Sequence, residues 1–302
     1  MATPDFCGGS FASEERQPVM YVDPTAPRAG RPRQPRTLPA VSDYHLVTNG
    51  HRIERRQFEE ELALAARIQA RLFPAVLPQL AGCELAARNR PALLCGGDYY
   101  DVLPTAEPGE LGPHLLCVAD VSGKGLPASL LMSNLQATLR ASLGFRPGLV
   151  DLVVRTNELL HASTPTDRYI TAILANFEPA TGRCTFVNAG HNGGILIRRD
   201  GRIDCLKATG PPLGLLRDLP FLSESVELFP GDVLCLYSDG VPEAFNPQEE
   251  EWGDERLMGC LHQCRHMDPE RIVAKVFEAI DSFAGHAPQH DDITMLILKR
   301  KG

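Results

Sequence analysis

Residues 115–125 read Leu-Leu-Cys-Val-Ala-Asp-Val-Ser-Gly-Lys-Gly, an apolar run that meets an aspartate and then a glycine-containing turn. A short apolar run bounded by a turn is typical of a buried β-strand. A sheet would fix the direction of the Asp120 carboxylate at the end of such a strand, and the glycines would let backbone or ligand come close. The segment therefore predicts a buried strand with a rigidly held carboxylate at its end.

Three more aspartates stand in comparable places. Asp98 follows Gly96-Gly97, Asp239 follows the apolar run 233–237, and Asp291 precedes the apolar run 293–298. Two unit charges about 4 Å apart repel by roughly 4 kcal/mol at an effective dielectric near 20, so a cluster of these carboxylates would need cations. All-oxygen ligands favour Mg²⁺ or Mn²⁺ over Zn²⁺. A single Asp-Gly after a strand is usually only a turn, so a metal site and unrelated turns both stay open on these residues alone.

Grouped strands and grouped helices follow Gly82. The patterns predict helices at 126–143, 149–162, 255–264 and 269–283, and strands at 84–89, 115–121, 169–177, 184–188, 195–198, 225–228, 233–237 and 294–298. Short turns such as Asp200-Gly201 join several consecutive strands, which favours antiparallel hairpins over parallel crossovers. Strands and helices in separate groups indicate an α+β fold.

The N-terminal region divides into two parts. Residues 1–50 are poor in large apolar residues and rich in proline and arginine, so we expect a disordered segment. Apolar residues at spacings of three and four then predict a helix at 53–73: Phe58, Leu62, Ala65, Ile68 and Leu72. We assign 51–80 to a helical linker and 81–302 to the folded domain. The apolar stripe of the helix could pack on that domain or pair with a second copy of the chain.

Composition limits the class of protein. The 302 residues carry a net charge of −8, which argues against a general nucleic-acid binder. No run approaches 18 apolar residues and the first ten residues lack the regions of a signal peptide, so we expect no membrane association and a cytoplasmic location. The nine cysteines lie scattered among apolar residues. We expect four of them to be small buried side chains in a reducing compartment: Cys117, Cys184, Cys205 and Cys235.

Three further patterns favour simpler explanations. Cys260, His262, Cys264 and His266 are metal ligands by type, but residues two apart on a helix point to different sides, so we expect cysteines inward and histidines outward. Residues 122–125 lack the upstream glycine and the Lys-Ser/Thr pair of a nucleotide-binding P-loop. A Gly-x-Ser-x-Gly elbow is absent from the sequence, which removes the commonest serine-hydrolase interpretation.

Six blocks occur in an order that identifies a family resemblance. They are Gly96-Gly97-Asp98-Tyr99-Tyr100-Asp101, Val118-Ala119-Asp120-Val121-Ser122-Gly123-Lys124-Gly125, Asn188-Ala189-Gly190-His191, Thr209-Gly210-Pro211-Pro212-Leu213-Gly214, Tyr237-Ser238-Asp239-Gly240 and Asp291-Asp292-Ile293-Thr294. With the preceding helix, the chain from about residue 60 to residue 300 resembles the bacterial SpoIIE/RsbU-type branch of the PPM metal-dependent protein phosphatases.

The resemblance implies a four-layer α-β-β-α sandwich of two antiparallel sheets, preceded by a single helix. It also implies two divalent cations, Mn²⁺ or Mg²⁺, at one end of the sandwich. Their ligands would be Asp98, Asp120, the backbone carbonyl of Val121, Asp239 and Asp291. Asp101 and Asp292 would be supporting or turn residues. His191 could donate a proton to the leaving serine or make a structural hydrogen bond, and no arginine matches the phosphate-binding position of the eukaryotic branch.

The implied reaction is hydrolysis of protein phosphoserine or phosphothreonine by direct attack of metal-bound hydroxide, with Asp120 and Asp239 acting through the metal-bound water. The implied substrate is a STAS-type anti-anti-sigma regulator. An alternative is a catalytically weak PPM-like binding module in a partner-switching pathway, although all the matching carboxylates are present. The 53–73 helix could make a homodimer, and a shift of this helix could move Asp98.

Overall fold

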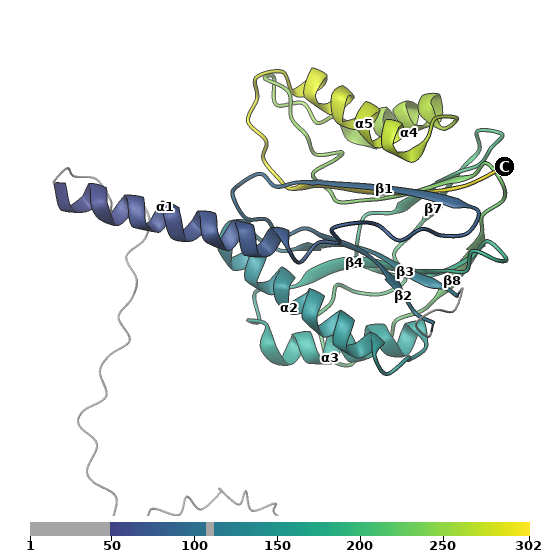
Figure 1. The fold of residues 1–302 in the computed structure, drawn as a ribbon, viewed down its shortest axis with the longest axis horizontal. Helices are drawn as coiled ribbons and strands as arrows, with labels where there is room; N and C mark the ends of the chain where they lie inside the picture. Colours follow the sequence, from purple (N-terminus) through teal and green to yellow (C-terminus); the bar gives the residue numbers. More distant parts are fainter. Residues whose placement is uncertain (1–48, 107–111) are drawn as a thin grey trace, which may run out of the picture. The chain divides into compact units, whose positions relative to one another are not determined.

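The computed structural model describes residues 49–106 and 112–302. Two five-stranded antiparallel sheets face each other, and two helices cover the outer face of each sheet (Figure 1). This confirms the predicted α+β class and the four-layer sandwich. The segment expected to be disordered, 1–50, lies outside the described residues except for 49 and 50, which belong to the first helix instead.

The first sheet has the strand order β1-β10-β9-β6-β7. Its strands are β1 Cys83–Arg90, β6 Gly194–Ile197, β7 Ile203–Leu206, β9 Val233–Tyr237 and β10 Ile293–Arg300. Strand β1 pairs with β10 along its whole length, so the first and last strands of the domain lie side by side. Helices α4 Gly253–Cys264 and α5 Pro269–Ala284 pack on the outer face through an apolar layer that includes Leu257 and Phe277.

The second sheet has the order β2-β3-β4-β5-β8. Its strands are β2 Tyr99–Pro104, β3 His114–Val121, β4 Ile170–Phe177, β5 Arg183–Ala189 and β8 Glu224–Glu227. Helices α2 Gly125–Leu143 and α3 Leu149–Ser163 cover its outer face. The four helices predicted after residue 82 are therefore confirmed, each within two residues of the expected ends.

The alternation of side chains along the strands explains both the apolar layer between the sheets and the polar groups at one end of that layer. Side chains of the inner faces, such as Leu116, Val118, Leu234 and Leu296, are fully buried in one apolar cluster. Because successive strand side chains point to opposite faces, the next inner positions along β3, β9 and β10 fall at the same end of the sandwich. They are Asp120, Ser238 and Thr294. The apolar inner layer thus ends in polar groups at one edge.

Two strands were not predicted, and one cysteine was placed wrongly. Strand β2 begins immediately after Asp98, in a stretch to which the sequence patterns assigned no element. Strand β7 is a short edge strand in which only Leu206 is buried. The prediction that Cys205 is buried is wrong, because its side chain lies on the exposed side of this edge strand. The other three cysteines of that set are buried.

Helix α1 spans Asn49–Ala70 and ends three residues before the predicted end at 73. Leu62 and Ala65 are partly buried, whereas Phe58 and Ile68 of the predicted stripe are 60% and 58% exposed. The stripe is therefore only partly covered by the domain. Across residues 49–106 and 112–302, no helix has both the length and the hydropathy needed to span a membrane.

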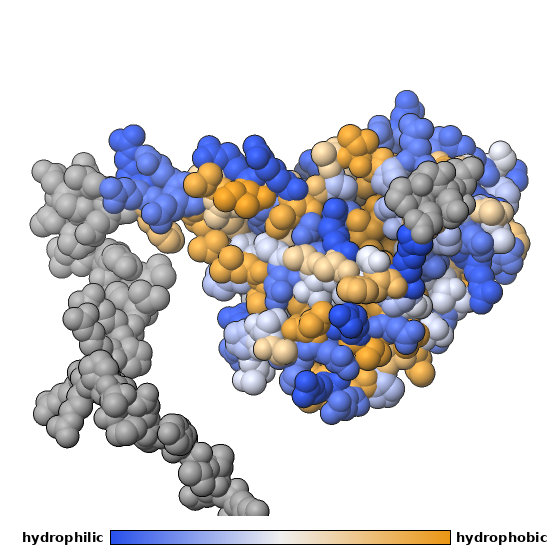
Figure 2. All heavy atoms as spheres, turned by 60° about the horizontal axis from the view of Figure 1, so that its bottom comes forward, coloured by the Kyte–Doolittle hydropathy of each residue, from blue (hydrophilic) through white to orange (hydrophobic). Residues whose placement is uncertain are grey.

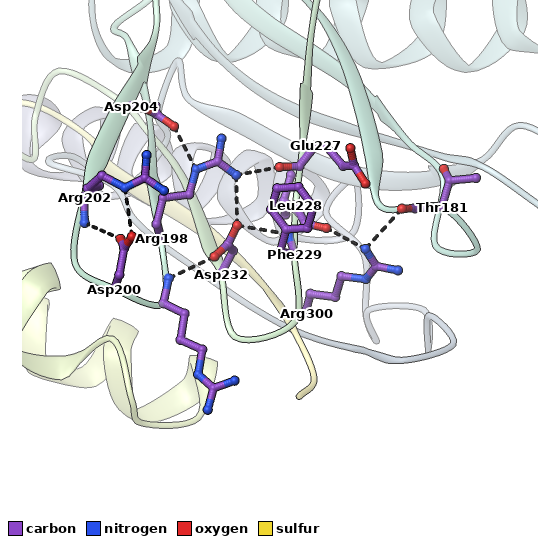
Figure 3. Close-up of polar contacts among 11 residues, drawn as sticks. Thr181, Arg198, Asp200, Arg202, Asp204, Glu227, Leu228, Phe229, Asp232 and Arg300 are labelled. Atoms are coloured by element: carbon purple, nitrogen blue, oxygen red, sulfur yellow. Dashed lines mark hydrogen bonds and ion pairs between the residues drawn. The ribbon is translucent and has the colours of Figure 1, made fainter.

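A buried carboxylate fastens the end of the sandwich opposite the polar edge, where β9 begins and β10 ends. The Asp232 side chain accepts hydrogen bonds from the backbone N–H groups of Arg199 and Phe229, at 2.9 and 3.0 Å, and from Arg198 Nη1 at 2.9 Å (Figure 3). Arg198 also pairs with Asp204 on β7. This network joins the β6–β7 hairpin to the turn between β8 and β9.

Replacing Asp232 should destabilise the fold. Asp232→Ala leaves two backbone N–H groups without their acceptor and removes one of the acceptors of the Arg198 guanidinium, which should lower the free energy of unfolding by roughly 2–4 kcal/mol. Urea denaturation followed by circular dichroism measures this loss. Asp200→Ala, in the exposed turn after β6, is the matched control and should have little effect. Equal stability of the two variants would contradict the assignment.

Candidate functional site

Four aspartates meet at the polar edge of the sandwich. Asp120 lies within β3, Asp98 directly precedes β2, Asp239 lies two residues beyond β9, and Asp291 lies two residues before β10. The negative charges of Asp239 and Asp291 raise the pKa of Asp120, and the charge of Asp120 raises that of Asp98, so the four carboxylates lie close enough to interact. Both sheets therefore contribute carboxylates to one cluster, as the strand-end pattern in the sequence predicted.

Asp98 is the most deeply buried member of the cluster. Its Oδ2 accepts hydrogen bonds from Ser238 Oγ at 2.6 Å and from Thr294 Oγ1 at 2.5 Å, so the residue after β9 and a residue of β10 in the opposite sheet orient it. Its Oδ1 is buried and has no hydrogen-bond partner among the described residues. Burial, and then the charge of Asp120, raise the pKa of Asp98 well above its ordinary value. Burying a carboxylate oxygen without a partner costs free energy unless a ligand binds it.

The neighbouring carboxylates also resist ionisation. Burial, followed by the charges of Asp239 and Asp291, raises the pKa of Asp120 to about 7. Burial and the charge of Asp291 also raise the pKa of Asp239, against the opposing effects of the Gly240 N–H and the Lys124 charge. The cluster is therefore electrostatically unfavourable when it carries its full negative charge alone.

Asp292 and the glycine pair shape the loop before Asp98. The Asp292 carboxylate accepts hydrogen bonds from the backbone N–H groups of Ala92 at 2.7 Å and Gly97 at 2.6 Å. A Cβ on Gly96 would lie 2.4 Å from Asp292 Oδ2, and one on Gly97 would lie 3.0 Å from the Val121 carbonyl oxygen. Only glycine fits this approach. The contacts match the supporting role expected for Asp292 and bring the Val121 carbonyl beside the loop.

Helix α1 reaches the same loop through a residue that sequence reasoning missed. The Gln69 side chain is buried, donates from Nε2 to the Gly96 carbonyl at 2.6 Å and accepts from the Gly96 N–H at 3.1 Å through Oε1. These two hydrogen bonds fasten the last turn of α1 to Gly96, which lies two residues before Asp98 in the chain. A glutamine among apolar helix positions was the available signal, but its partner lies 27 residues away in the sequence.

Asp101 lies on the other face of β2 and takes no part in the cluster. Its Oδ2 accepts hydrogen bonds from Arg140 Nε at 3.0 Å, from Arg140 Nη2 at 2.7 Å and from the Tyr99 hydroxyl. The expectation of a turn or a supporting residue at the site is wrong for Asp101. This side chain is instead half of an ion pair between β2 and α2.

His191 makes a buried hydrogen bond at the inner edge of the second sheet. Its Nδ1 lies 2.8 Å from Thr171 Oγ1, and Thr171 is paired with Asp120 in the β3–β4 register. Burial lowers the pKa of His191 to about 4, so the imidazole is neutral at neutral pH. Of the two alternatives, the geometry favours the structural hydrogen bond over proton donation by a charged imidazole.

The cysteine and histidine run at 260–266 has the packing predicted for an ordinary helix. Cys264 is buried, Cys260 is partly buried, and His262 and His266 are exposed. In the part of the chain that the structure describes, no three His, Cys, Asp or Glu side chains are arranged as a ready metal site. The aspartate cluster is no exception, and Lys124 Nζ lies there 2.8 Å from Asp291 Oδ2.

The donor set at the cluster nevertheless fits hard divalent cations. The available ligands are carboxylate oxygens and a backbone carbonyl, which suit Mg²⁺ and Mn²⁺. Asp98 offers a buried oxygen without a partner among the described residues. The charge of Asp239 raises the pKa of Asp120, and the charge of Asp291 raises the pKa of Asp239. A bound cation would give the buried Asp98 oxygen a partner and would offset the repulsion among the carboxylates.

Known proteins are similar to this chain in sequence or in fold. A family model described as stage II sporulation protein E (SpoIIE) matches residues 112–301. The phosphoserine phosphatase RsbU of Bacillus subtilis (strain 168) is 27% identical over 251 residues, which cover 82% of this chain and 72% of RsbU. The SiaA-PP2C domain of Pseudomonas aeruginosa matches with a TM-score of 0.70 at 19% identity, over 82% of this chain and 98% of that domain. The catalytic domain of the serine threonine protein phosphatase PstP, solved with two manganese ions, matches with a TM-score of 0.54 at 17% identity, over 73% of this chain and 99% of that one.

The metal-free protein should lose stability as the pH rises. Asp120 has a pKa of about 7 in the folded state against an ordinary value of 3.8. Between these values the folded state binds more protons than the unfolded state, so stability falls with increasing pH through this window. In EDTA the thermal midpoint should drop by roughly 5 °C between pH 5 and pH 8.

Asp120→Asn should flatten that slope and raise the midpoint at pH 8 above that of the unsubstituted protein, because it removes one buried charge. Asp218→Asn, in an exposed loop, is the matched control and should keep the original slope. If the midpoint of Asp120→Asn at pH 8 is at or below that of the unsubstituted protein, the ionised Asp120 carboxylate does not destabilise the metal-free fold.

Proposed function

The chain belongs to the SpoIIE family of PPM-type protein serine/threonine phosphatases, and we propose that it removes phosphate from a phosphoserine or phosphothreonine of a STAS-type anti-anti-sigma regulator. The observation that supports this function most directly is the convergence of Asp98, Asp120, Asp239 and Asp291 at one edge of the sandwich. The similarity to the phosphoserine phosphatase RsbU supports a phosphoserine substrate. The STAS-type regulator and the partner-switching setting are what the family resemblance implies.

The proposed cation ligands are the four aspartates and the Val121 carbonyl, which we infer to hold two divalent cations, Mn²⁺ or Mg²⁺. The manganese ions of the PstP structure support this proposal. Divalent cations in such a site supply Lewis-acid chemistry, in which they polarise phosphoryl oxygens and acidify bound water. Ser238 and Thr294 orient Asp98, and Asp292 holds the glycine loop, so the chain itself prepares the geometry.

The alternative function is a catalytically weak binding module in a partner-switching pathway. It predicts the loss of one or more of the carboxylates, since binding a partner does not require them. Asp98, Asp120 and Asp239 are all present, and each is held where its charge is unfavourable. A binding module would gain stability by replacing them, so the retained cluster favours the enzyme.

Helix α1 is the proposed site of pairing between two copies. Hydrophobic side chains remain exposed along it, among them Phe58, Leu64 and Ile68, and the space-filling view shows hydrophobic residues among its charged ones (Figure 2). Every residue from 55 to 61 is exposed, so this stretch is open to a partner helix. Pairing at α1 would bear on the cluster directly, because Gln69 bonds to Gly96.

The purified protein should dephosphorylate a phosphoserine STAS-type protein only when Mn²⁺ or Mg²⁺ is present. Asp239→Asn should lower the rate at least about 100-fold while the circular dichroism spectrum stays the same, because the carboxylates are not needed for folding. Release of phosphate, measured with and without EDTA, checks both statements. Activity that survives exhaustive chelation would rule out the cation-dependent function.

Two variants of α1 separate pairing from positioning. Gln69→Met keeps the size of the side chain but removes both bonds to Gly96, and it should weaken Mn²⁺ binding by roughly tenfold through a displaced Asp98. Ile68→Glu places a charge on the exposed stripe and should give a monomeric mass by light scattering, with Mn²⁺ affinity retained in the monomer. Unchanged Mn²⁺ affinity in Gln69→Met would disprove the positioning role, and unchanged mass in Ile68→Glu would disprove pairing.

A further inference from the structure

Lys124 spans the aspartate cluster from one sheet to the other. It lies in the turn between β3 and α2, yet its Nζ lies 2.8 Å from Asp291 Oδ2 and also donates to the backbone carbonyl of His290. Burial and neighbouring carboxylates raise the pKa values of Asp239 and Glu243, and the Lys124 charge opposes that rise at both. The ammonium is therefore the protein's own positive charge at the cluster.

The local helix gives no reason for a lysine at this position. Lys124 is the N-cap of α2, and its side chain makes no capping hydrogen bond there. Serine, threonine, aspartate and asparagine are the favoured N-cap residues, and a positive charge is unfavourable beside the N-terminal end of a helix dipole. The first turn of α2 also has no acidic residue that would offset the charge. The contacts of the lysine with Asp291 and His290, on the opposite side of the site, explain its presence at this position.

We propose that Lys124 is an exchangeable counter-ion, which neutralises Asp291 when no divalent cation is bound and turns to the phosphoryl group when one is. A divalent cation at Asp291 would repel the ammonium that pairs with the same carboxylate, so the two positive charges compete for it. The Lys124 side chain is 48% exposed and has a flexible four-carbon stem, so it is free to move once Asp291 is taken. The phosphate contact rests on the proposed function, whereas the exchange at Asp291 does not.

The exchange predicts that loss of the lysine changes Mn²⁺ binding and phosphate binding in opposite directions. Without the ammonium, Asp291 stays open to cations, so Mn²⁺ should bind more tightly by about two- to fivefold, the range expected for an exposed ion pair. Without the ammonium, the cation-loaded site also lacks one contact to phosphate, so inorganic phosphate should bind about five- to tenfold more weakly. A lysine that merely decorates the surface would change neither quantity.

The test compares Lys124→Met with Lys275→Met in the full chain. Lys275 is similarly exposed and pairs with Glu278 on α5, so its replacement removes the same charge away from the cluster. The Mn²⁺ dissociation constant comes from electron paramagnetic resonance of the free ion, and binding of inorganic phosphate to the Mn²⁺-saturated protein comes from calorimetry. Lys124→Gln repeats both measurements in case the methionine variant does not fold.

Lys124→Met should bind Mn²⁺ more tightly and inorganic phosphate more weakly than Lys275→Met. Equal or weaker Mn²⁺ binding would overturn the exchange at Asp291, and unchanged phosphate binding would overturn the contact to the phosphoryl group. Neither measurement needs turnover. A protein that shows the Mn²⁺ shift but releases no phosphate from phosphoproteins would refute the proposed function and leave the exchange at Asp291 standing.

Discussion

Mutual repulsion among carboxylates that rigid strands hold together is the constraint on which the functional end of this molecule depends. Asp98 and Asp120 are placed by β2 and β3 of one sheet, and Asp239 and Asp291 by β9 and β10 of the other. Closing the sandwich therefore forces like charges together at its edge. The apolar layer between the sheets supplies the free energy for that closure, because its side chains are removed from water almost completely.

Other buried carboxylates of the chain show how the same problem is solved without a cation. Asp232 accepts from two backbone N–H groups and Arg198, and Asp101 accepts from Arg140 and Tyr99. Each of these carboxylates has a guanidinium from the protein beside it. Within residues 49–106 and 112–302, Asp98 has two hydroxyl donors, both at one of its oxygens, and no guanidinium beside it. The contrast within one chain is what makes a structural role for the cluster a poor explanation.

The sequence predicted those features that depend on short-range patterns. Apolar runs that stop at an aspartate placed Asp120 and Asp239 at strand ends, and alternation along β9 and β10 already contained the information that Ser238 and Thr294 face inward. The features that were missed depend on pairing between distant segments. The partner of Gln69 is Gly96, and the Lys124 contact to Asp291 spans 167 positions, so no local pattern encodes either. Strand β2 was missed because it carries a buried charged side chain, Asp101, whose partner Arg140 lies 39 positions away in the sequence.

The position of Gly96 explains how a helix outside the sandwich can bear on a site inside it. Gly96 is bonded by Gln69 from one side, and the space for its missing side chain is filled by the Asp292 carboxylate on the other. Two residues later, Asp98 is held by hydroxyls from the opposite sheet. Gly97, between them, donates its N–H to Asp292. A displacement of the last turn of α1 therefore cannot be absorbed by a flexible linker, because every residue from Gly96 to Asp98 is already fixed by a hydrogen bond or by close packing. The movement must either be resisted or be transmitted to Asp98.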